Sequence, residues 1–430
     1  MKIRVGVFFG GKSVEHEVSV ISGLQAYNAF NKEKYDLVPI YITKENELYT
    51  GEAIADIANY RNIPELLKRS TRVFLMGEKN GVKLIQYPEK KFGSSEVAQI
   101  DVAFPVVHGA NVEDGSLQGF LRHYNIPFAG CDVMASAVTM DKYVMKTVLK
   151  DNDIPVLDCV TLYGKEYESD EQAAYEKVEK KIPYPVIVKP VNLGSSVGIK
   201  VAKDREQLRE ALEYAFTFGP KVLVERAIMN LREINCAVLG DYEEAQASEC
   251  EEPISSDEIL SYEDKYVAGG KGGSEGMRTA KRELPAKLTP EKREEIRELA
   301  VKTFRTLGCN GVSRIDFMID KDTDQVYVNE INPIPGSLAF YLWEALGKPY
   351  AELLDDMVKL ALKREREEQN MLTSFDSNIL QIMQGVNGLY NDTQAGKKEA
   401  FMRLEQLRKK GTVTDYDAEL ASYREEKYGK

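Results

Sequence analysis

The sequence predicts an α/β protein of several domains, and three features of the chain support this fold class. Residues 3–9 form a short apolar run, residues 13–29 are typical of a helix, and residues 35–43 return to an apolar, extended pattern. A β-α-β order of this kind predicts a parallel sheet. Farther along, residues 311–338 predict two strands joined by a polar turn. The length of 430 residues is sufficient for two to four domains.

The composition is that of a globular protein and argues against two kinds of partner. Hydrophobic residues make up 43% and charged residues 29% of the chain, and the net charge is −12. Nucleic acid is not expected as a partner, because phosphate binding needs a basic surface. No apolar run approaches the roughly 20 residues of a membrane span. The five cysteines have no CxxC spacing and the chain opens on a strand rather than a signal peptide, so we expect a cytoplasmic location.

The first predicted strand overlaps a sequence that imitates a phosphate-binding loop. Residues 6–13, GVFFGGKS, match the pattern GxxxxGK[ST] letter for letter. In a true phosphate loop, the residues after the first glycine curve around the phosphate. Here Val7, Phe8 and Phe9 occupy those positions and are better suited to a buried strand. We therefore predict a strand at this position and no phosphate loop.

Two polar residues of the N-terminal region are candidate site residues, each with a purely structural alternative. Glu15 falls in the first turn or cap of the first helix, where an acid often only balances the helix dipole. It is also placed to receive the ammonium group of an amino-acid substrate. His108 ends a predicted strand at residues 101–107 and begins a glycine-rich polar loop, followed by a helix at residues 116–124. Ligands bind at such strand ends in open α/β sheets, although a single histidine can also be a packing residue.

The remaining segments of the first 181 residues predict ordinary secondary structure. A change of composition near residue 130 indicates a domain boundary. The predicted elements are a helix at 63–69, strands at 73–76, 82–87 and 126–130, and helices at 134–152 and 169–181.

A glycine- and serine-rich loop lies between two predicted strands in the middle of the chain. Residues 184–190 and 199–201 predict the strands, and residues 191–198 form the loop. A loop in this position is a hairpin flap whose backbone N–H groups can cover phosphates. Lys189 lies within the otherwise apolar first strand, and an unpaired buried lysine would be costly. We therefore expect Lys189 to serve as a positive charge at a ligand site.

The next elements predict a nucleotide-binding edge. The strand at residues 221–226 ends in Glu225 and Arg226, where backbone groups of a strand can pair with an adenine edge and an acid can bind ribose hydroxyls. Another strand at residues 232–238 carries Glu233. The other elements are a helix at 206–216, a long charged and glycine-rich segment at 251–285 that is typical of a lid or a disordered segment, and a helix at 290–308.

The two strands at residues 312–319 and 325–331 predict a metal site. Arg314 lies two residues from Asp316 and therefore on the same strand face, and Glu330 has the same relation to Asn332. Pairing as a hairpin would bring Asp316, Glu330 and Asn332 together. Such oxygen ligands suit Mg²⁺, and Arg314 beside them would bind an oxyanion. The alternative is an edge hairpin with solvated charges.

In combination, these motifs resemble the D-alanine–D-alanine ligases, which are ATP-grasp enzymes. The motifs EHEVS, HGxxxEDGxxQG, VIVKP followed by GSSVG, YxxKY, RIDF and NEINPIPG occur in one order over roughly residues 1–365. The resemblance implies a three-domain fold with ATP held between the sheets of the central and C-terminal domains. It also implies that ATP phosphorylates the carboxylate of one amino acid, and that the amine of a second attacks the acyl phosphate to form the amide of a peptidoglycan precursor.

The resemblance assigns roles to residues at the matched motifs. Those implied to bind ATP are Lys142, Lys189, Gly194, Ser195, Ser196, Val197, Glu225, Arg226, Glu233 and Lys265. Those implied to hold two Mg²⁺ ions, with Mn²⁺ as an alternative, are Asp316, Glu330 and Asn332. Those implied to bind the amino-acid substrates are Glu15, His108, Ser337 and Leu338. Those implied to act in catalysis are Glu15, Ser195, Tyr266 and Arg314, with Arg314 stabilising the acyl phosphate and the tetrahedral intermediate.

Three departures from the family pattern bear on the acceptor and on the C-terminus. The segment after Gly336, which in the family contacts the carboxylate of the second substrate, is about four residues short, and no Ser-Leu pair stands at the usual offset. The lid after Tyr266 is lengthened and glycine-rich. Residues 366–430 have no counterpart in the family core. The first two departures leave open a different acceptor, such as D-serine or a hydroxy acid, and loss of catalysis is a further alternative.

We predict four structural parts and a homodimer. The parts are an N-terminal parallel α/β domain at 1–130, a central α+β domain at 131–228, a C-terminal α+β domain with the metal site at 229–365, and a helical tail at 366–430. Phe401, Leu404 and Leu407 recur at helical spacing in the tail, so it either docks on its own core or adds an oligomer contact.

Overall fold

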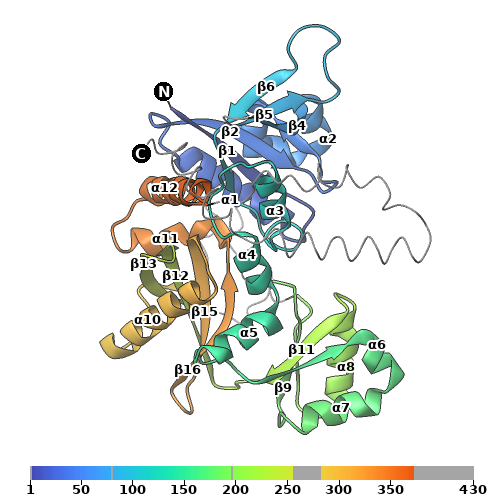
Figure 1. Cartoon of the computed structure of the whole chain (residues 1–430). Coiled ribbons are helices and arrows are strands. Elements are labelled where there is room, and N and C mark those ends of the chain that lie inside the picture. The colour runs from blue at the N-terminus through green and yellow to red at the C-terminus, as the bar shows by residue number, and fades with distance from the viewer. Residues whose placement is uncertain (1, 79–80, 195–196, 255–281, 372–430) are drawn as a thin grey trace, which may run out of the picture. The chain divides into compact units, whose positions relative to one another are not determined.

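A computed structural model describes residues 2–78, 81–194, 197–254 and 282–371. The chain divides into a first unit, residues 1–368, and a second unit, residues 369–430. The predictions for Ser195, Ser196, Lys265 and Tyr266 lie outside the described residues, as does the predicted tail helix beyond residue 371. Within the described residues, the first unit contains three β-sheets with helices packed against them (Figure 1).

The first sheet has a parallel centre extended by antiparallel strands. The β1 strand pairs in parallel with β2 on one side and β7 on the other, as the β-α-β pattern predicted. The strands β3 to β6 add by antiparallel pairing, because short turns rather than crossover helices connect most of them. The sheet order is β6-β5-β4-β3-β2-β1-β7, with β1 Ile3–Gly10, β2 Tyr35–Ile42, β3 Leu48–Thr50, β4 Thr71–Glu78, β5 Gly81–Gln86, β6 Glu96–Ile100 and β7 Val102–Pro105.

The imitation of a phosphate loop is a strand, as predicted. Residues 6–10 belong to β1, and Val7, Phe8 and Phe9 are fully buried. The helix that follows begins at His16 with Glu15 as its N-cap residue, which confirms the predicted position of Glu15. The helices of this region are α1 His16–Ala29, α2 Ile63–Lys68 and α3 Ser116–His123, with short 3₁₀ turns at Glu52–Ala55 and Ile57–Arg61.

The helix predicted at residues 134–152 is wrong in one respect, because it is two helices. These are α4 (Val133–Met140) and α5 (Lys142–Asp151). Asp141 between them has an extended backbone, with φ −86° and ψ 100°, and its carboxylate accepts hydrogen bonds from the backbone N–H groups of Tyr143 and Val144. The break therefore follows from N-capping by an aspartate, and it sets Lys142 at the start of α5.

The second sheet is antiparallel and contains the predicted flap hairpin. The β9 and β10 strands pair in antiparallel fashion around the glycine-rich loop. The helix predicted at 169–181 is present as α7, which begins after Asp170 because this aspartate caps it by accepting from the N–H of Ala173. A separate short helix, α6, precedes it. The sheet order is β10-β9-β11-β8, with β8 Cys159–Tyr163, β9 Val186–Pro190, β10 Lys200–Ala202 and β11 Lys221–Arg226, and the helices are α6 Gly164–Ser169, α7 Glu171–Glu179 and α8 Arg205–Phe216.

The third sheet contains the predicted hairpin of β15 and β16. Its order is β14-β13-β12-β15-β16, with β12 Leu231–Gly240, β13 Ala245–Pro253, β14 Arg282–Glu283, β15 Gly311–Asp320 and β16 Gln325–Asn332. The helix α10 (Pro290–Thr306) packs on β12, β13 and β15. A 3₁₀ turn at Gly336–Ala339 follows the hairpin, and then come α11 Phe340–Glu344 and α12 Tyr350–Gln369.

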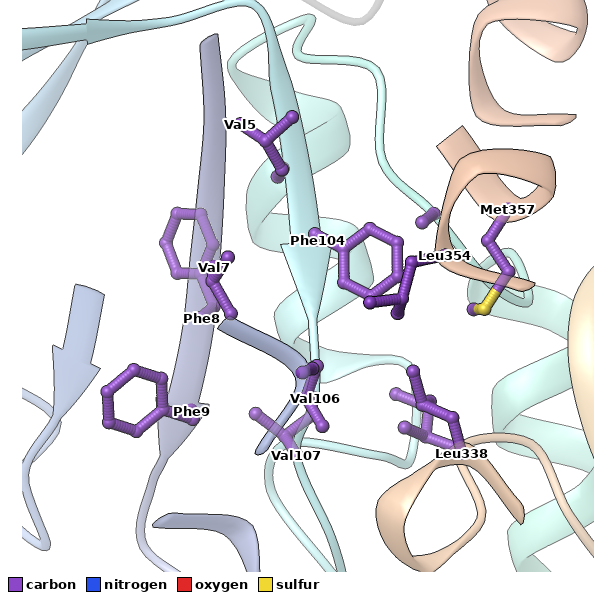
Figure 2. Close-up of a cluster of buried hydrophobic side chains, with 14 of the residues drawn as sticks. Val5, Val7, Phe8, Phe9, Phe104, Val106, Val107, Leu338, Leu354 and Met357 are labelled. Carbon is purple, nitrogen blue, oxygen red and sulfur yellow. The ribbon is translucent and has the colours of Figure 1, made fainter. Parts of the chain in front are cut away.

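The end of the first unit packs into the core of the N-terminal sheet. Figure 2 shows Val5 and Phe104 of β1 and β7 near Leu354 and Met357 of α12, with Leu338 in the same buried cluster. The helices α4 and α5, in contrast, share a core with α10 and the third sheet. Segments that are distant in sequence therefore join the first and third sheets, whereas the second sheet has a core of its own.

Candidate active site

One face of the third sheet carries a row of polar side chains across four strands. Asp316 of β15 lies directly opposite Glu330 of β16 and, on its other side, opposite Asn235 of β12. Asn235 in turn lies opposite Glu251 of β13. Residues directly opposite in antiparallel strands project from the same face. The other face is apolar and is buried under α10, because Ile234, Cys236, Ile315 and Phe317 alternate with the polar residues.

The predicted convergence of the hairpin residues is present, with cations paired to both carboxylates. Arg314 binds Asp316 in bidentate fashion, with Nε at 2.6 Å from Oδ1 and Nη2 at 2.7 Å from Oδ2. Asn332 donates to the same carboxylate at 3.2 Å. Glu330 forms an ion pair with Lys142 at 3.3 Å. Burial lowers the pKa of Arg314, but the charge and hydrogen bonds of Asp316 raise it by more. The pKa therefore lies well above its usual value, and Arg314 is a cation.

These residues fit the magnesium site that the sequence predicts. In the described part of the chain, no cluster of three or more His, Cys, Asp and Glu side chains could hold a metal by itself. Asp316 and Glu330 supply two carboxylates, which is the number that Mg²⁺ commonly takes from protein beside substrate phosphates and water. Asn332 adds an amide at hydrogen-bond distance from Asp316. The metal role of the three residues stays a prediction that this donor set supports.

Lys189 is buried, as predicted, and its counter-charge is a fully buried glutamate. Glu225 of β11 contacts the Nζ of Lys189 and pairs with the Nζ of Lys146 at 2.9 Å. Lys189 also donates to Asn329 at 3.1 Å. Burial alone would raise the pKa of Glu225, but the two lysines outweigh burial and lower it to about 2. The cluster carries one net positive charge, which suits the binding of a phosphate group.

The flap and Lys142 are joined by two hydrogen bonds. The Nζ of Lys142 donates to the carbonyl of Leu193 at 2.8 Å, and its backbone N–H donates to the carbonyl of Val191 at 3.2 Å. The backbone N–H of Val197 closes the described end of the loop by donating to the carbonyl of Gly194. Lys142 thus connects the flap to Glu330 of the polar row.

Two further residues predicted to bind the nucleotide, Arg226 of β11 and Glu233 of β12, lie in different surroundings. Arg226 turns to Asp320 at the end of β15, at 2.9 Å, so this side chain ties the second sheet to the third. Glu233 lies on β12, on the same face as Asn235 two residues later. Their roles at adenine and ribose stay predictions.

Glu15 lies beside both glycine-rich loops. A Cβ on Gly109 would stand 2.8 Å from Oε2 of Glu15 and 2.2 Å from Oγ of Ser13, and the φ of Gly109 is +86°. A Cβ on Gly194 would stand 3.3 Å from the same carboxylate oxygen. Any other residue at position 109 would displace the Glu15 carboxylate. The structure therefore brings Glu15 next to the loop after β7 and next to the flap.

His108 is buried and has a defined tautomer. Its Nδ1 lies 3.0 Å from the carbonyl of Ile334, which can only accept, so Nδ1 carries the proton. Burial lowers the pKa of His108 to about 4, and the charge of Arg314 contributes, so the ring is neutral. Its Nε2 is then a hydrogen-bond acceptor, and it has no partner among the described residues. A buried acceptor without a partner indicates a ligand site.

Glu113 is a site residue that the sequence reasoning did not single out. Its carboxylate accepts from the N–H of Gly109 at 2.7 Å and from the N–H of Ile334 at 3.2 Å, so it joins the loop after β7 to the exit of the metal hairpin. Burial raises its pKa to about 8, and the nearby charge of Glu15 adds to this shift. Other residues missed are Lys146, Asn235, Glu251, Arg282 and Tyr341. The spacing of Lys142 and Lys146, one helical turn apart, was the one available signal.

Ser337 and Leu338 are buried within the turn that follows the hairpin. Oγ of Ser337 lies 2.6 Å from Oε1 of Gln25, and its backbone N–H donates to Oγ of Ser22 at 3.1 Å, both on α1. The side chains of Ser337 and Leu338 are 1% and 0% exposed. Direct contact of either side chain with a substrate therefore stays an untested prediction.

Buried lysines on one sheet and paired carboxylates on the next provide cations for phosphates and oxygen ligands for a divalent metal. With the glycine-rich hairpin at their junction, they place the fold in the ATP-grasp class of nucleotide-dependent enzymes. The family model described as D-ala D-ala ligase N-terminus matches residues 4–131, and the one described as D-ala D-ala ligase C-terminus matches residues 148–359. The chain belongs to the D-alanine–D-alanine ligase family of carbon–nitrogen ligases.

Similar proteins support this assignment across most of the chain. The D-alanine–D-alanine ligase of Thermosipho melanesiensis is 38% identical over 384 residues, which are 89% of this chain and 99% of that protein. That of Caldicellulosiruptor bescii is 40% identical over 376 residues, 86% of this chain and 98% of that protein. Among solved structures, the D-alanine–D-alanine ligase from Coxiella burnetii matches with a TM-score of 0.72 and 30% identity, over 86% of this chain and 96% of that one. The VanG D-Ala:D-Ser ligase from Enterococcus faecalis matches with a TM-score of 0.70 and 30% identity, over 84% and 100%.

No described helix combines the length and apolar character that crossing a bilayer requires. Neither family model extends beyond residue 359, so residues 360–430 lie outside both.

Proposed function

We propose that the protein is an ATP- and Mg²⁺-dependent ligase that joins two D-alanines through an acyl phosphate, as a step in the synthesis of peptidoglycan precursors. The observation that carries the proposal is the contact of the loop after β7, which holds His108 and lies beside Glu15, with the end of the hairpin that carries Arg314. Loops from the N-terminal sheet and from the metal hairpin are joined there by the contacts of Glu113 and His108 with Ile334. The names of the relatives support the choice of D-alanine.

The first substrate would be held by two acceptors and activated beside a cation. The Glu15 carboxylate and the neutral Nε2 of His108 both accept hydrogen bonds, which suits the ammonium group of an amino acid. Arg314 would bind the phosphoryl oxygens that develop on the substrate carboxylate, and later the oxyanion of the tetrahedral intermediate. Asp316 fixes the plane of that guanidinium through two hydrogen bonds, so Arg314 needs little reorganisation.

The nucleotide would be held by the lysines, with its metal ions on the hairpin. Lys142 and Lys189 stand at the flap and at the buried glutamate, where cations can contact phosphate oxygens. Two Mg²⁺ ions, or Mn²⁺ in their place, would be bound by Asp316, Glu330 and Asn332 and would neutralise charge on the phosphates. Glu225, Arg226 and Glu233 complete the proposed nucleotide site, with Lys265 and Tyr266 contributed by the lid motif.

The test is a phosphate-release assay with ATP and Mg²⁺ against single and paired D- and L-amino acids, with the products identified by mass. D-Alanyl-D-alanine formed from D-alanine alone is the expected result. Release only with a second, different acceptor such as D-serine would keep the mechanism and change the product. A D-Ala:D-Ser ligase is among the solved structures with a similar fold. No release with any pair would contradict the proposal.

Arg314→Ala and Glu330→Ala should each abolish turnover. The first removes the cation at the reacting centre, and the second removes a metal ligand, each at a cost of at least about 10²-fold in kcat. ATP affinity should persist in Arg314→Ala, because that residue acts on the transferred phosphoryl group. A near-normal rate in either variant would show that the assigned role is wrong.

The finer features of the proposal concern assembly and location. We expect a homodimer in the cytoplasm, with domains at residues 1–130, 131–228 and 229–365. Light scattering tests the oligomeric state, and limited proteolysis tests the domain boundaries.

A further inference from the structure

The segment after Gly336 has a backbone that few sequences would adopt. Ser337, Leu338 and Ala339 all have positive φ, at 48°, 54° and 47°. Residues other than glycine avoid this left-handed region because of steric contact of Cβ, and three in succession are rare. The contacts of Ser337 with α1 hold the turn in place. Such a strained turn in a short connection serves to re-aim the chain that follows it.

The turn re-aims the chain so that Tyr341 reaches the third sheet. Its hydroxyl donates to Oε1 of Glu251 on β13 at 2.7 Å, and Asn235 donates to the same oxygen at 3.0 Å. The other oxygen of Glu251 pairs with Nη1 of Arg282 at 3.2 Å. The guanidinium of Arg282 also lies over the Tyr341 ring, 3.9 Å from its centroid. These three side chains, Tyr341, Glu251 and Arg282, are termed the acceptor cluster below.

The acceptor cluster lies on the same face as the reacting centre, at the opposite end of the polar row from Glu330. Glu251 is opposite Asn235, and Asn235 is opposite Asp316. Neighbouring strands are about 4.8 Å apart, so Glu251 stands roughly 10 Å from Asp316 along the row. The lysines of the proposed nucleotide site are at the other end, because Lys142 contacts Glu330. The negative charge of Glu251 also contributes to the raised pKa of Arg314.

We propose that Arg282, oriented by Glu251 and Tyr341, binds the carboxylate of the acceptor amino acid. This assignment rests on the proposed ligase function. A free amino acid brings a carboxylate that needs a cation, and arginine matches its planar geometry better than lysine. Stacking on Tyr341 and pairing with Glu251 restrict the guanidinium before the substrate arrives, which lowers the entropic cost of binding. Ser337 then acts as a positioning residue, since its bonds to α1 hold the turn that delivers Tyr341.

The test compares acceptors with and without a carboxylate. The wild-type chain and the Arg282→Gln and Arg282→Lys variants are assayed with D-alanine as donor and either D-alanine or D-alaninamide as acceptor, and each product is identified by mass. Loss of a charged hydrogen bond should raise the acceptor KM of Arg282→Gln by about 10- to 150-fold, with the donor KM and the ATP KM unchanged. The preference for D-alanine over D-alaninamide in kcat/KM should fall by a similar factor. Arg282→Lys should recover part of it, and Tyr341→Phe should lose several-fold.

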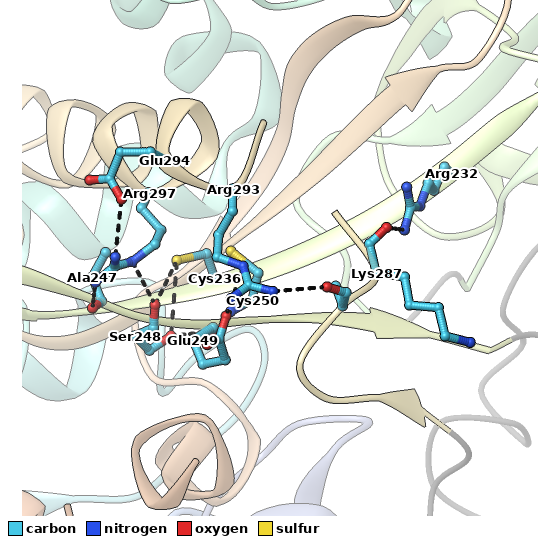
Figure 3. A network of polar contacts seen from close by, with 11 residues as sticks. Arg232, Cys236, Ala247, Ser248, Glu249, Cys250, Lys287, Arg293, Glu294 and Arg297 are labelled. Carbon is cyan, nitrogen blue, oxygen red and sulfur yellow. Dashed lines mark hydrogen bonds and ion pairs between the residues drawn. The ribbon is translucent and has the colours of Figure 1, made fainter. Parts of the chain in front are cut away.

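The chain offers a control on the opposite face of the same sheet. Arg232 of β12 pairs with Glu252 of β13 at 2.6 Å. It also donates to the carbonyl of Lys287, as Figure 3 shows. Arg232→Gln removes an arginine–glutamate pair of the same sheet that is more exposed than the pair of Arg282 and Glu251, and it should leave the acceptor preference unchanged.

The outcomes separate the acceptor assignment from the proposed function. A wild-type chain that forms no dipeptide would overturn both. An active wild type whose acceptor preference is the same in Arg282→Gln would overturn the assignment of Arg282 alone. Equal loss of preference in Arg232→Gln would do so too, because it would reveal a general effect on the sheet.

Discussion

Glu225→Gln is the substitution that most directly tests the buried charge cluster of the second sheet. The glutamate is inaccessible to solvent and is the counter-charge of both Lys189 and Lys146. Glutamine keeps the volume and one acceptor oxygen but removes the charge. Two buried ammonium groups would then face each other without a counter-ion, which is the situation that makes breaking a buried ion pair costly.

The expected loss can be worked in two independent ways. The pKa of Glu225 falls from 4.5 to about 2, and at 1.36 kcal/mol for each unit the charged form is stabilised by about 3 kcal/mol. Removal of one partner from a buried pair costs about 3–5 kcal/mol in other proteins. The two values agree, and at about 2.1 cal/mol/K of unfolding entropy per residue they correspond to a fall of roughly 4 to 6 °C in melting temperature for the first unit, residues 1–368.

The assay is thermal denaturation of the wild type and the variant, with Glu213→Gln as the control. Glu213 forms an exposed i,i+4 pair with Arg209 on α8, and its loss should change stability by less than about 0.5 kcal/mol. Because the folded pKa of Glu225 is depressed, its stabilisation is present above pH 4.5 and is lost as the pH falls from 4.5 towards 2. The difference in melting temperature between the wild type and Glu225→Gln should therefore become smaller as the pH is lowered. Equal melting temperatures for Glu225→Gln and Glu213→Gln at neutral pH would refute the reasoning.

Two further predictions concern the C-terminal tail and Glu113, which joins two loops by hydrogen bonds. The pKa of Glu113 is raised to about 8, chiefly by burial, so its contribution to stability is complete below pH 4.5 and is lost as the pH rises through 8. Glu113→Gln should therefore reduce the dependence of the melting temperature on pH over this range. An unchanged dependence would contradict the raised pKa. If the tail docks on its own core, truncation before Asn370 should leave the number of protomers in each particle unchanged, as measured by light scattering. Dissociation of the truncated protein would instead assign the tail to the oligomer contact.

The features that depend on nearest neighbours in sequence were predictable. Alternation with a period of two set Arg314 and Asp316 on one face, and the hairpin turn then placed Glu330 opposite Asp316. The apolar residues after Gly6 argued against a phosphate loop, because large apolar side chains are stabilised in a buried strand and not in a loop that curves around phosphate. Position alone also placed Glu15 at the cap of α1.

The helix boundaries were less predictable, since a capping side chain competes with helix propagation. Asp141 and Asp170 each cap a helix, and Asp141 lies inside the span that the sequence predicted as a single helix. Their effect depends on whether the flanking segments can pack at a new angle, which periodicity does not reveal.

The sequence by itself determined the family, the order of the elements and the identity of the charged residues on each strand, because these depend on short-range patterns and on motifs. Only the tertiary structure decided which charges meet. Lys146 reaches Glu225 across 79 residues, and Glu113 reaches Ile334 across 221. Tyr341 meets Glu251 because a left-handed turn redirects α11 towards β13. Burial makes each of these contacts obligatory, since a polar group removed from water must find its partner wherever the packed sheets place one.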